Sequence, residues 1–306
     1  MATTTGTTQA KPGPPVEEGG SGPIVELRGV GKSFGNIRAL SGVDLKVSTG
    51  EVTCILGDNG AGKSTLIKII AGLHEPTSGE YRVDGRPVKF SSPREALNRG
   101  IATVYQDLAI VQLMPVWRNF FLGSELSTGA GPFRRLDVKR MRAICDEELQ
   151  KMGIDLPNID LPVQNLSGGQ KQVLAIARAI YFGARVLILD EPTAALGVKQ
   201  SGVVLKYINA ARDAGLGVIF ITHNPHHAFM VGDHFVVIKL GEMEFDAPRS
   251  ELSLQDLTHH MAGGAELDAL EHELERGQVP EVDPLHGVKS KESVEPELPH
   301  QAERKG

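Results

Sequence analysis

The chain has 306 residues, of which 41 % are hydrophobic, and carries a formal net charge of −6. This length provides a core for one large α/β domain or for two small ones. No apolar run approaches the roughly 18 residues that a membrane-spanning helix needs, and Met1–Gly22 lacks the apolar centre of a secretory signal. The two cysteines, Cys54 and Cys145, lie in separate apolar patterns, which favours a reducing compartment over a disulfide scaffold. We therefore expect a cytoplasmic protein.

The charge is concentrated towards the C-terminus. Residues 265–306 contain 11 acidic and 5 basic residues, so residues 1–264 balance at 27 of each sign. Composition predicts disorder for residues 1–22 and for the acidic tail at 264–306, apart from at most one short helix with Leu267, Leu270 and Leu274 on one face. The tail is either a solvated extension or a regulatory arm. The balanced remainder argues against nucleic acid as a partner, because binding to a phosphate backbone needs a basic surface.

Between these ends, apolar runs typical of strands alternate with helical patterns, which predicts a mostly parallel sheet flanked by helices. The early strands, with a turn at Asp84-Gly85, predict an antiparallel portion beside it. Residues 107–182 hold two long helical patterns and no convincing central strand, which indicates a helical insertion. The predicted strands are Ile24–Leu27, Val43–Val47, Glu51–Leu56, Tyr81–Val83, Ile101–Tyr105, Val186–Leu189, Gly217–Ile221 and Phe235–Lys239, and the predicted helices are Lys63–Ala71, Pro93–Arg99, Val138–Met152, Gly168–Phe182, Val198–Ala214 and Arg249–Met261.

Residues 57–65 carry the strongest motif of the chain, two glycines five apart followed by a lysine and a hydroxyl residue. A predicted strand precedes the motif and a predicted helix follows it, which is the context of a phosphate-binding loop. The glycines let backbone N–H groups face phosphate oxygens, and the helix N-terminus adds partial positive charge. Lys63 would contact the β- and γ-phosphates, and Ser64 would bind Mg²⁺. The alternative is a glycine-rich turn. The expected nucleotide contacts are Gly57, Asp58, Asn59, Gly60, Ala61, Gly62, Lys63, Ser64 and Thr65.

A second element of a nucleotide site follows at Asp190 and Glu191. Asp190 ends a predicted buried strand, where ligands of parallel sheets bind, and could hold Mg²⁺ through water. Glu191 could accept a proton from an attacking water. Alone, this pair could equally be a solvated strand end, but the phosphate loop upstream favours the catalytic interpretation.

The segment Leu166-Ser167-Gly168-Gly169-Gln170 opens a helical pattern. Ser167 is a natural N-cap, and the two glycines leave the first backbone N–H groups of the helix uncovered. Such a helix start would bind an anion, although its own sequence neighbourhood supplies none. Simple helix capping is the alternative for this segment taken alone.

The phosphate loop, Leu-Ser-Gly-Gly-Gln at 166–170, Leu-Asp-Glu-Pro-Thr at 189–193 and Ile-Thr-His-Asn at 221–224 occur in the order and spacing of ABC-type ATPases. The chain resembles this family over about residues 24–262. The resemblance implies a P-loop NTPase fold with a RecA-like α/β core, an antiparallel β-subdomain and a helical ABC subdomain at about 107–182. These parts would form one ATPase domain at 23–263, with ATP and Mg²⁺ as its cofactors.

The resemblance also implies roles for residues that sequence patterns alone leave open. Gln106 matches the glutamine that senses Mg²⁺ and the water, and His223 matches the switch histidine at the γ-phosphate. Phe34 stands where the family stacks an aromatic ring on adenine. The implied catalytic residues are Glu191, His223, Gln106 and Lys63, the implied metal contacts are Ser64, Gln106 and Asp190, and the implied further nucleotide contacts are Phe34, Ser167, Gly168, Gly169 and Gln170.

Each of these residues has a plainer alternative when it is taken singly. Gln106 could be a polar strand end, and Phe34 could be a core residue. His223, with His226 and His227, could suggest a metal cluster, although no Cys or carboxylate joins them. The joint pattern favours the nucleotide site.

In this family two domains pair head to tail, and the Ser167–Gln170 region of one covers the γ-phosphate that the other holds. The single set of motifs therefore implies a homodimer, closed by ATP and opened by hydrolysis. Gly197 departs from the pattern, because the family commonly has the D-loop aspartate there, and this departure leaves communication between the two sites open. The segments 105–109 and 194–199 resemble the ATPases of monosaccharide importers.

A subunit of this kind would act with separate permease subunits at the cytoplasmic face of the membrane, and indirectly with an extracytoplasmic sugar-binding protein. The resemblance favours a sugar importer of the single-module fructose type. The alternatives are the ATPase of an ABC exporter and an ABC ATPase outside transport. Residues 115–121 lie where the family docks its permease, and Trp117 is either a contact there or a core residue.

Overall fold

The computed structural model describes residues 22–129, 133–154, 156 and 158–262. The disorder predicted for 1–22 and 264–306 therefore lies outside the described residues except at Gly22, as does the helix predicted around Leu267, Leu270 and Leu274. None of the helices in the described part is both long and apolar enough to cross a membrane.

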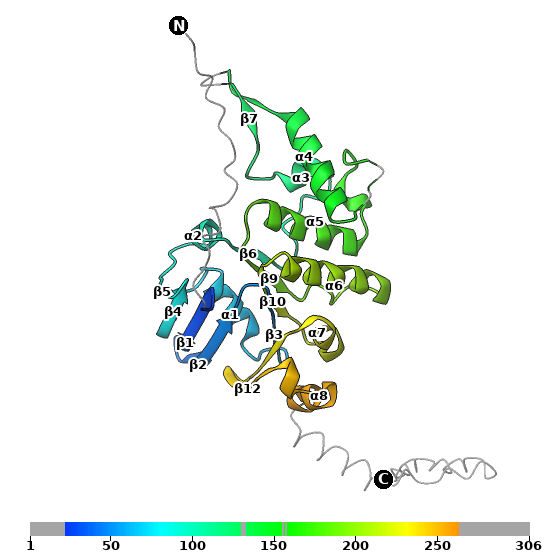
Figure 1. Cartoon of the computed structure of the whole chain (residues 1–306). Coiled ribbons are helices and arrows are strands. Elements are labelled where there is room, and N and C mark those ends of the chain that lie inside the picture. Colours follow the sequence, from blue (N-terminus) through cyan, green and yellow to red (C-terminus); the bar gives the residue numbers. More distant parts are fainter. Residues whose placement is uncertain (1–21, 130–132, 155, 157, 263–306) are drawn as a thin grey trace, which may run out of the picture. The chain divides into compact units, whose positions relative to one another are not determined.

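A six-stranded sheet forms the centre of the fold (Figure 1). Five of its strands are parallel, and β12 pairs antiparallel with β11 at one edge. Every residue of β3 and β10 is buried, as their continuous apolar runs predict. The strand order is β12 (Glu242–Pro248), β11 (His234–Lys239), β3 (Val52–Leu56), β10 (Gly217–Ile221), β9 (Val186–Asp190) and β6 (Ile101–Val104).

A separate antiparallel sheet confirms the second predicted portion. Its strand order is β2 (Ile37–Val47), β1 (Val25–Phe34), β4 (Ser78–Val83) and β5 (Arg86–Pro87). The β4–β5 turn falls at Asp84 and Gly85, with φ angles of 51° and 71°. Arg185, next to β9, donates two hydrogen bonds of 2.7 and 2.9 Å to the Asp84 carboxylate, which lowers the pKa of that carboxyl and links the two sheets.

The central sheet carries a different apolar core on each face, because side chains alternate along a strand. Ile55 belongs to the core that includes α1 (Lys63–Ile70) and the antiparallel sheet. Its neighbours Cys54 and Leu56 belong to the core on the other face. Helices α6 (Val198–Asp213), α7 (Pro225–Val231) and α8 (Leu254–Ala262) contribute to this second core, and α2 (Pro93–Asn98) contributes Ala96 to the first.

The chain between β6 and β9 forms the predicted helical insertion, with a core of its own. Trp117 is only 9 % exposed in this core, and its Nε1 donates to Asp160 at 3.1 Å, so the ring is a core residue. The insertion also contains a two-strand hairpin that the sequence did not indicate. Its elements are α3 (Val116–Phe120), β7 (Ser127–Thr128), β8 (Arg135–Leu136), α4 (Val138–Lys151), the 3₁₀ turn η2 (Val163–Asn165) and α5 (Gly168–Tyr181).

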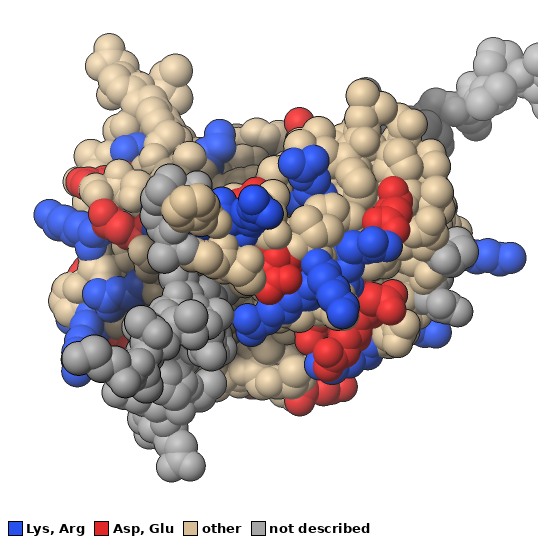
Figure 2. Space-filling view, turned by 90° about the horizontal axis from the view of Figure 1, so that it is seen from above, with Lys and Arg blue, Asp and Glu red and all other residues tan. Residues whose placement is uncertain are grey.

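Figure 2 views the structure from the end at which α4 lies in Figure 1, and this face has mixed charge. Lys151 pairs with Glu147 and Glu148 on α4, at 2.8 Å each. Arg142 pairs with Asp160. Lysine and arginine side chains therefore stand beside acidic ones here instead of forming one basic surface.

The sequence did not indicate α3, α7 or β12, and it placed one helix boundary wrongly. The predicted helix Arg249–Met261 is interrupted, because Leu252 is extended with a φ of −134°. A 3₁₀ turn, η3 (Arg249–Glu251), precedes this residue, and α8 follows it. Ser253 starts α8 by accepting a hydrogen bond from the N–H of Asp256 at 3.1 Å.

Asn119 holds the irregular segment between β6 and α3. Its side chain is 3 % exposed, and its Oδ1 accepts a 2.8 Å hydrogen bond from the N–H of Val111. Its Nδ2 donates to the carbonyls of Val111, Met114 and Pro115 at 3.0–3.2 Å. The Val111 N–H has no other acceptor among the described residues, so the Asn119 amide satisfies it, and it adds bonds to carbonyls that already accept from other N–H groups.

Replacing Asn119 with alanine should lower the free energy of unfolding by about 1–3 kcal/mol, because the Val111 N–H loses its acceptor and the bonds from Asn119 Nδ2 to nearby carbonyls are lost. Urea unfolding followed by circular dichroism measures the change. Asn98→Ala is the control, since Asn98 is exposed on α2, and it should cost less than about 0.5 kcal/mol. Equal midpoints for the two variants would contradict the role of Asn119.

Candidate functional site

Part of the predicted site lies at one edge of the central sheet, because four neighbouring parallel strands end there. β3 leads into the phosphate loop, β10 into His223, β9 into Asp190 and Glu191, and β6 into Gln106. Parallel strands share a direction, so their carboxyl ends share an edge, where ligands of such sheets bind. Segments that are far apart in the sequence are thereby made neighbours.

The phosphate loop keeps several backbone donors free. The N–H groups of Gly60, Gly62, Lys63 and Ser64 have no hydrogen-bond acceptor among the described residues. The loop is closed on itself by a 3.2 Å bond from the N–H of Ala61 to the carbonyl of Asp58. Free N–H groups at the start of a helix favour an anion such as a phosphate.

Two glycines of the loop are also required by the backbone on its other side. Gly57 has a φ of 138°, and a Cβ there would lie 2.1 Å from the carbonyl oxygen of Ile238. Gly62 has a φ of 109°, and a Cβ there would lie 2.8 Å from the carbonyl oxygen of Ala39. A Cβ on Gly60 would meet nothing within 4 Å. From the sequence, these glycines were explained only by the need for backbone N–H groups to face phosphate oxygens.

Lys63 is buried, with 8 % of the residue exposed. Its ammonium donates to the carbonyls of Gly57 at 2.5 Å and Asp58 at 2.8 Å. Burial lowers the pKa of Lys63, and the nearby carboxylates of Glu191, Asp58 and Asp190 oppose this shift. The cation is therefore held between the phosphate loop and the acids at the end of β9.

The Glu191 carboxylate has an acceptor position that no protein group fills well. Its Oε2 is buried and lies 2.9 Å from His223 Nδ1, but no described residue gives it a well-aligned hydrogen bond. Glu191 also has a φ of 49°, which is rare for a residue with a side chain and indicates local strain. Burial raises the pKa of the adjacent Asp190, and the negative charge of Glu191 raises it further. A buried carboxylate oxygen beside an imidazole suits a general base.

Gln106 and Phe34 lie at the periphery of the site. Gln106 is exposed just after β6, and its side chain has no hydrogen bond among the described residues. Phe34 ends β1 and is 43 % exposed, outside the apolar cores. The Lys32 ammonium lies 5.2 Å from its ring centroid, and His74 contacts it edge-on at 5.3 Å. A half-exposed ring of this kind is available for stacking on a base.

Ser167 caps α5 as predicted. Its Oγ accepts a 3.2 Å hydrogen bond from the N–H of Gln170, and Gln170 Oε1 accepts one of 2.9 Å from the N–H of Ser167. In the described part of the chain, no hydrogen bond joins this cap to the phosphate loop. The cap is thus not a polar contact of the loop in the same chain.

The glycines after Ser167 allow α5 to pack closely against the segment that follows Glu191. A Cβ on Gly168 would lie 2.6 Å from Leu196 Cδ2, and one on Gly169 would lie 3.4 Å from Gln200 Cβ. These close contacts were not evident from the sequence, because they join two elements through side chains that have no local pattern.

The sequence also did not indicate the contact between the side chains of Thr193 and His227. Thr193 Oγ1 lies 3.0 Å from His227 Nδ1, and burial lowers the pKa of this histidine. Both residues line a cavity of about 250 Å³ together with His223. The cavity borders the start of α6, where Gly197 forms no side-chain cap and a Cβ would meet nothing within 4 Å. No group of three His, Cys, Asp or Glu side chains placed to hold a metal ion occurs among the described residues.

The residues at this edge suit a magnesium-bound nucleoside triphosphate. The free N–H groups of the loop and the Lys63 ammonium complement phosphate charge. The exposed Ser64 hydroxyl and the Asp190 carboxylate are oxygen ligands of the kind that Mg²⁺ prefers. The open acceptor of Glu191 suits a water aligned for attack. Free donors on one side and a free acceptor on the other are what hydrolysis of a phosphate bond requires.

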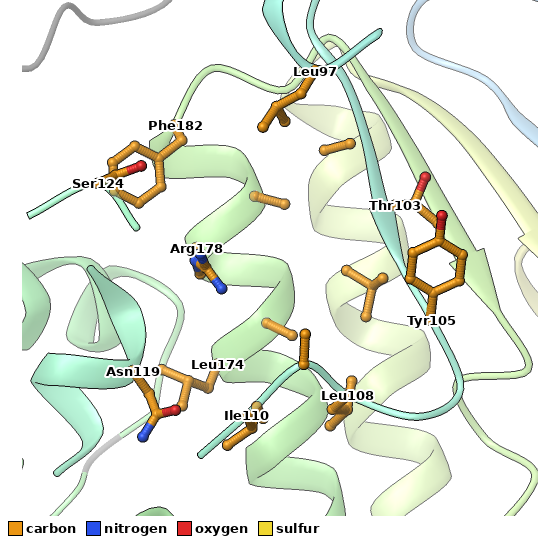
Figure 3. A pocket seen from close by; sticks show the side chains of 15 residues that line it. Leu97, Thr103, Tyr105, Leu108, Ile110, Asn119, Ser124, Leu174, Arg178 and Phe182 are labelled. Atoms are coloured by element: carbon orange, nitrogen blue, oxygen red, sulfur yellow. The ribbon is translucent and has the colours of Figure 1, made fainter. Parts of the chain in front are cut away.

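A groove of about 220 Å³ lies beside this edge, between α5 and the segment that carries Gln106 (Figure 3). Its lining is mostly apolar and includes Leu97 and Leu108. Figure 3 shows Arg178 projecting from α5, between Leu174 and Phe182 along the helix. Its guanidinium donates to the carbonyl of Leu122, and burial lowers the pKa of Arg178.

Comparison with known proteins identifies relatives over as much as 80 % of the chain. A family model described as ABC transporter matches residues 40–194. The chain is 42 % identical over 242 residues to the xylose/arabinose import ATP-binding protein XylG of Sulfolobus acidocaldarius, which covers 79 % of this chain and 95 % of that protein. It is 41 % identical over 248 residues to the fructose import ATP-binding protein FrcA of Rhizobium meliloti, covering 80 % and 95 %. A ribose import ATP-binding protein, RbsA of Yersinia pestis, is 38 % identical over 79 % of this chain, but the match spans only 46 % of RbsA.

Solved structures give the same fold. The ADP conformation of MJ1267, an ATP-binding cassette of an ABC transporter, matches with a TM-score of 0.67 at 22 % identity, over 84 % of this chain and 99 % of that one. A dimeric bacterial ABC transporter cassette, MJ0796, matches with a TM-score of 0.62 at 27 % identity, over 74 % and 99 %.

The backbone-side constraint on the phosphate loop can be measured without nucleotide. Gly57→Ala should lower the free energy of unfolding by more than about 2 kcal/mol, because its Cβ cannot coexist with the Ile238 carbonyl. Gly60→Ala introduces a left-handed alanine into the same loop without a contact and should cost only about 1 kcal/mol. Chemical unfolding of both variants measures the difference. If Gly57→Ala is as stable as Gly60→Ala, the proposed constraint is wrong.

Proposed function

Because this chain belongs to the ABC transporter family of ATP-binding proteins, we propose that it hydrolyses ATP to drive the import of a sugar, in particular a monosaccharide, through a separate permease. The observation that carries the enzymatic part is the meeting of the phosphate loop, Asp190, Glu191 and His223 at one sheet edge. ATP hydrolysis coupled to transport is the activity of this family.

The relatives support sugar import over the alternatives of export and of a role outside transport. The xylose/arabinose and fructose proteins are import ATP-binding proteins, and this chain covers 95 % of each. The ribose protein is about twice as long as its match, so this chain corresponds to one part of it. In extent, the matched part of this chain corresponds to the whole of the xylose/arabinose and fructose proteins, apart from about 5 % of each.

The chain's own residues would divide the work of hydrolysis. The loop N–H groups and Lys63 would hold the phosphates, while Glu191 would take a proton from the attacking water. His223, whose Nδ1 lies 2.9 Å from the Glu191 carboxylate, would orient this base and would contact the terminal phosphate. Mg²⁺, held through Ser64, Asp190 and Gln106, would neutralise charge on the phosphate oxygens. Phe34 would stack on the adenine.

A second copy of the chain would complete the site. Ser167 and the following glycines begin a helix whose polar start makes no hydrogen bond to the loop of its own chain in the described part. We assign this start to the terminal phosphate held by the partner, so that ATP closes the dimer and hydrolysis opens it. A dimeric cassette among the solved relatives supports this arrangement.

The groove beside Gln106 is the surface that we assign to the permease. It is mostly apolar, and Leu97 at its margin is 52 % exposed. Tyr105 lines the groove and directly precedes Gln106, so a helix seated there would bear on the segment that reaches the nucleotide. This assignment puts the protein at the cytoplasmic face of the membrane as a peripheral subunit. Trp117, for which the sequence left a permease contact and a core position open, is a core residue.

Glu191→Gln should still bind ATP and should trap a stable dimer, while hydrolysis falls by about 10²–10⁴-fold, since the amide cannot accept the proton. Radiolabelled ATP turnover and size-exclusion chromatography with ATP measure the two effects. Glu244→Gln, an exposed change on β12, is the control and should leave both unchanged. Normal turnover in Glu191→Gln would remove this residue from its role.

Leu97→Glu should uncouple transport, because it places a charge at the margin of an apolar groove. Sugar uptake into vesicles that contain the co-purified permease should fall by at least about tenfold, a cost of 1.4 kcal/mol in docking. ATP binding by the isolated subunit should be unchanged. Met230→Glu makes the same change at an exposed position of α7 outside the groove and should transport normally. Equal uptake by both variants would argue against the groove.

A further inference from the structure

The turn between β11 and β12 joins the phosphate loop to the antiparallel sheet. The N–H of Gly241 donates to the carbonyl of Ala61 in the loop at 2.8 Å, and the carbonyl of Gly241 accepts a 2.8 Å bond from the N–H of Ser41 on β2. The carbonyl of Ile238, at the end of β11, lies against the start of the loop at Gly57. The β11–β12 hairpin therefore contacts the phosphate loop at Gly57 and at Ala61, and its turn also contacts β2.

Close packing leaves the three segments little freedom to move independently. A Cβ on Gly241 would lie 2.7 Å from the carbonyl oxygen of Ala39, which is also the atom that excludes a Cβ from Gly62. Gly62 and Gly241 are themselves in contact range, since the ideal Cβ of Gly62 would be 3.4 Å from Gly241 Cα. The Ala39 carbonyl is thus enclosed between the phosphate loop and the turn.

The turn is held in this shape for backbone reasons. Leu240 has a φ of 50°, an unfavourable conformation for a residue with a Cβ, yet its side chain is 85 % exposed and packs in no core. The strained conformation is not offset by burial of leucine. Lys239 pairs with Glu242, so Leu240 and Gly241 are the two central residues of a hairpin turn, and such turns require a positive φ at both. In this turn the Gly241 N–H faces the loop and the Gly241 carbonyl faces β2.

The base-stacking residue lies on the same hairpin as this contact. Phe34 pairs with Ile37 at the tip of the β1–β2 hairpin, and Ala39 is two residues further along β2. The Arg38–Glu242 ion pair, at 3.5 Å, crosses the same seam. The phosphate loop follows β3 of the central sheet, whereas Phe34 ends β1 of the antiparallel sheet. Hydrogen bonds of Gly241 to Ala61 and to Ser41 link the loop directly to that second sheet.

We propose that the β11–β12 turn, centred on Gly241, is a positioning element that sets the spacing between the adenine platform at Phe34 and the phosphate loop. This inference rests on the proposed ATP-binding function. ATP contacts both places at once, so its affinity depends on their separation in the way that a bivalent ligand depends on the distance between two sites. Inorganic tripolyphosphate contacts the loop alone and is insensitive to that separation.

Gly241→Ala tests the proposal, because its Cβ forces the turn and β2 apart. Titration calorimetry with Mg²⁺ present should show the dissociation constant of ATP rising by about tenfold or more, a loss equal to 1.4 kcal/mol. The dissociation constant of tripolyphosphate should change by less than about twofold, a loss below 0.5 kcal/mol. A variant that was merely loosened at the loop would lose both ligands alike.

Gly85→Ala is the matched control. Gly85 occupies a hairpin turn of the antiparallel sheet with a φ of 71°, close to the 83° of Gly241, but a Cβ there would meet nothing within 4 Å. It carries the same conformational penalty without moving β2 from the loop. The ratio of the two dissociation constants should stay at its wild-type value in this variant.

The outcomes separate the inference from the proposed function. A wild-type protein that binds no ATP would overturn both, whereas normal ATP binding with equal loss of both ligands in Gly241→Ala would overturn the inference alone. If circular dichroism shows that Gly241→Ala does not fold, Glu242→Ala loosens the same seam by removing an exposed ion pair. It should then show the same selective loss of ATP at about twofold, and an unchanged ratio would overturn the inference.

Discussion

The site depends on the parallel pairing of β3, β10, β9 and β6, more than on any single side chain. In this register, Val218 lies beside Val52 and Leu187, so neighbouring strands advance together and end together. Residues that follow these strands therefore line one edge of the sheet, and those that follow adjacent strands are neighbours. The strands themselves need only be apolar on both faces, and this requirement makes their sequences simple and their ends the informative positions.

The phosphate loop lies between two sheets, and its glycines are therefore required for two separate reasons. One demand comes from the ligand, since N–H groups must be free and close to phosphate oxygens. The other comes from behind, where the carbonyls of Ile238 and Ala39 approach Gly57 and Gly62 so closely that no Cβ fits. Tight packing on the rear holds the front in its anion-binding shape, so that little reorganisation is needed when a nucleotide binds.

The helical insertion has its own core and therefore its own stability, while its contacts with the central sheet run through α5. Gly168 and Gly169 bring the start of that helix against Leu196 and Gln200, the segment that leads directly from Glu191. The groove with Arg178 lies along the same helix. The helix α5 thus contacts three parts of the molecule. These are the part assigned to a second copy, the part assigned to a permease and the part that holds the proposed general base.

The sequence by itself determined the phosphate loop, the Asp190–Glu191 strand end, the Ser167 cap and the central strands, because each depends on residues that are adjacent or regularly spaced in the chain. It missed α3, α7 and β12, which are short or charged and derive their order from neighbours, and it could not foresee the break at Leu252. Only the tertiary structure decided that Trp117 is a core residue, that Thr193 meets His227, and that the turn at Gly241 reaches the phosphate loop. Those facts arise from contacts between residues far apart in the chain, where the free energy of packing and hydrogen bonding has no counterpart in local sequence pattern.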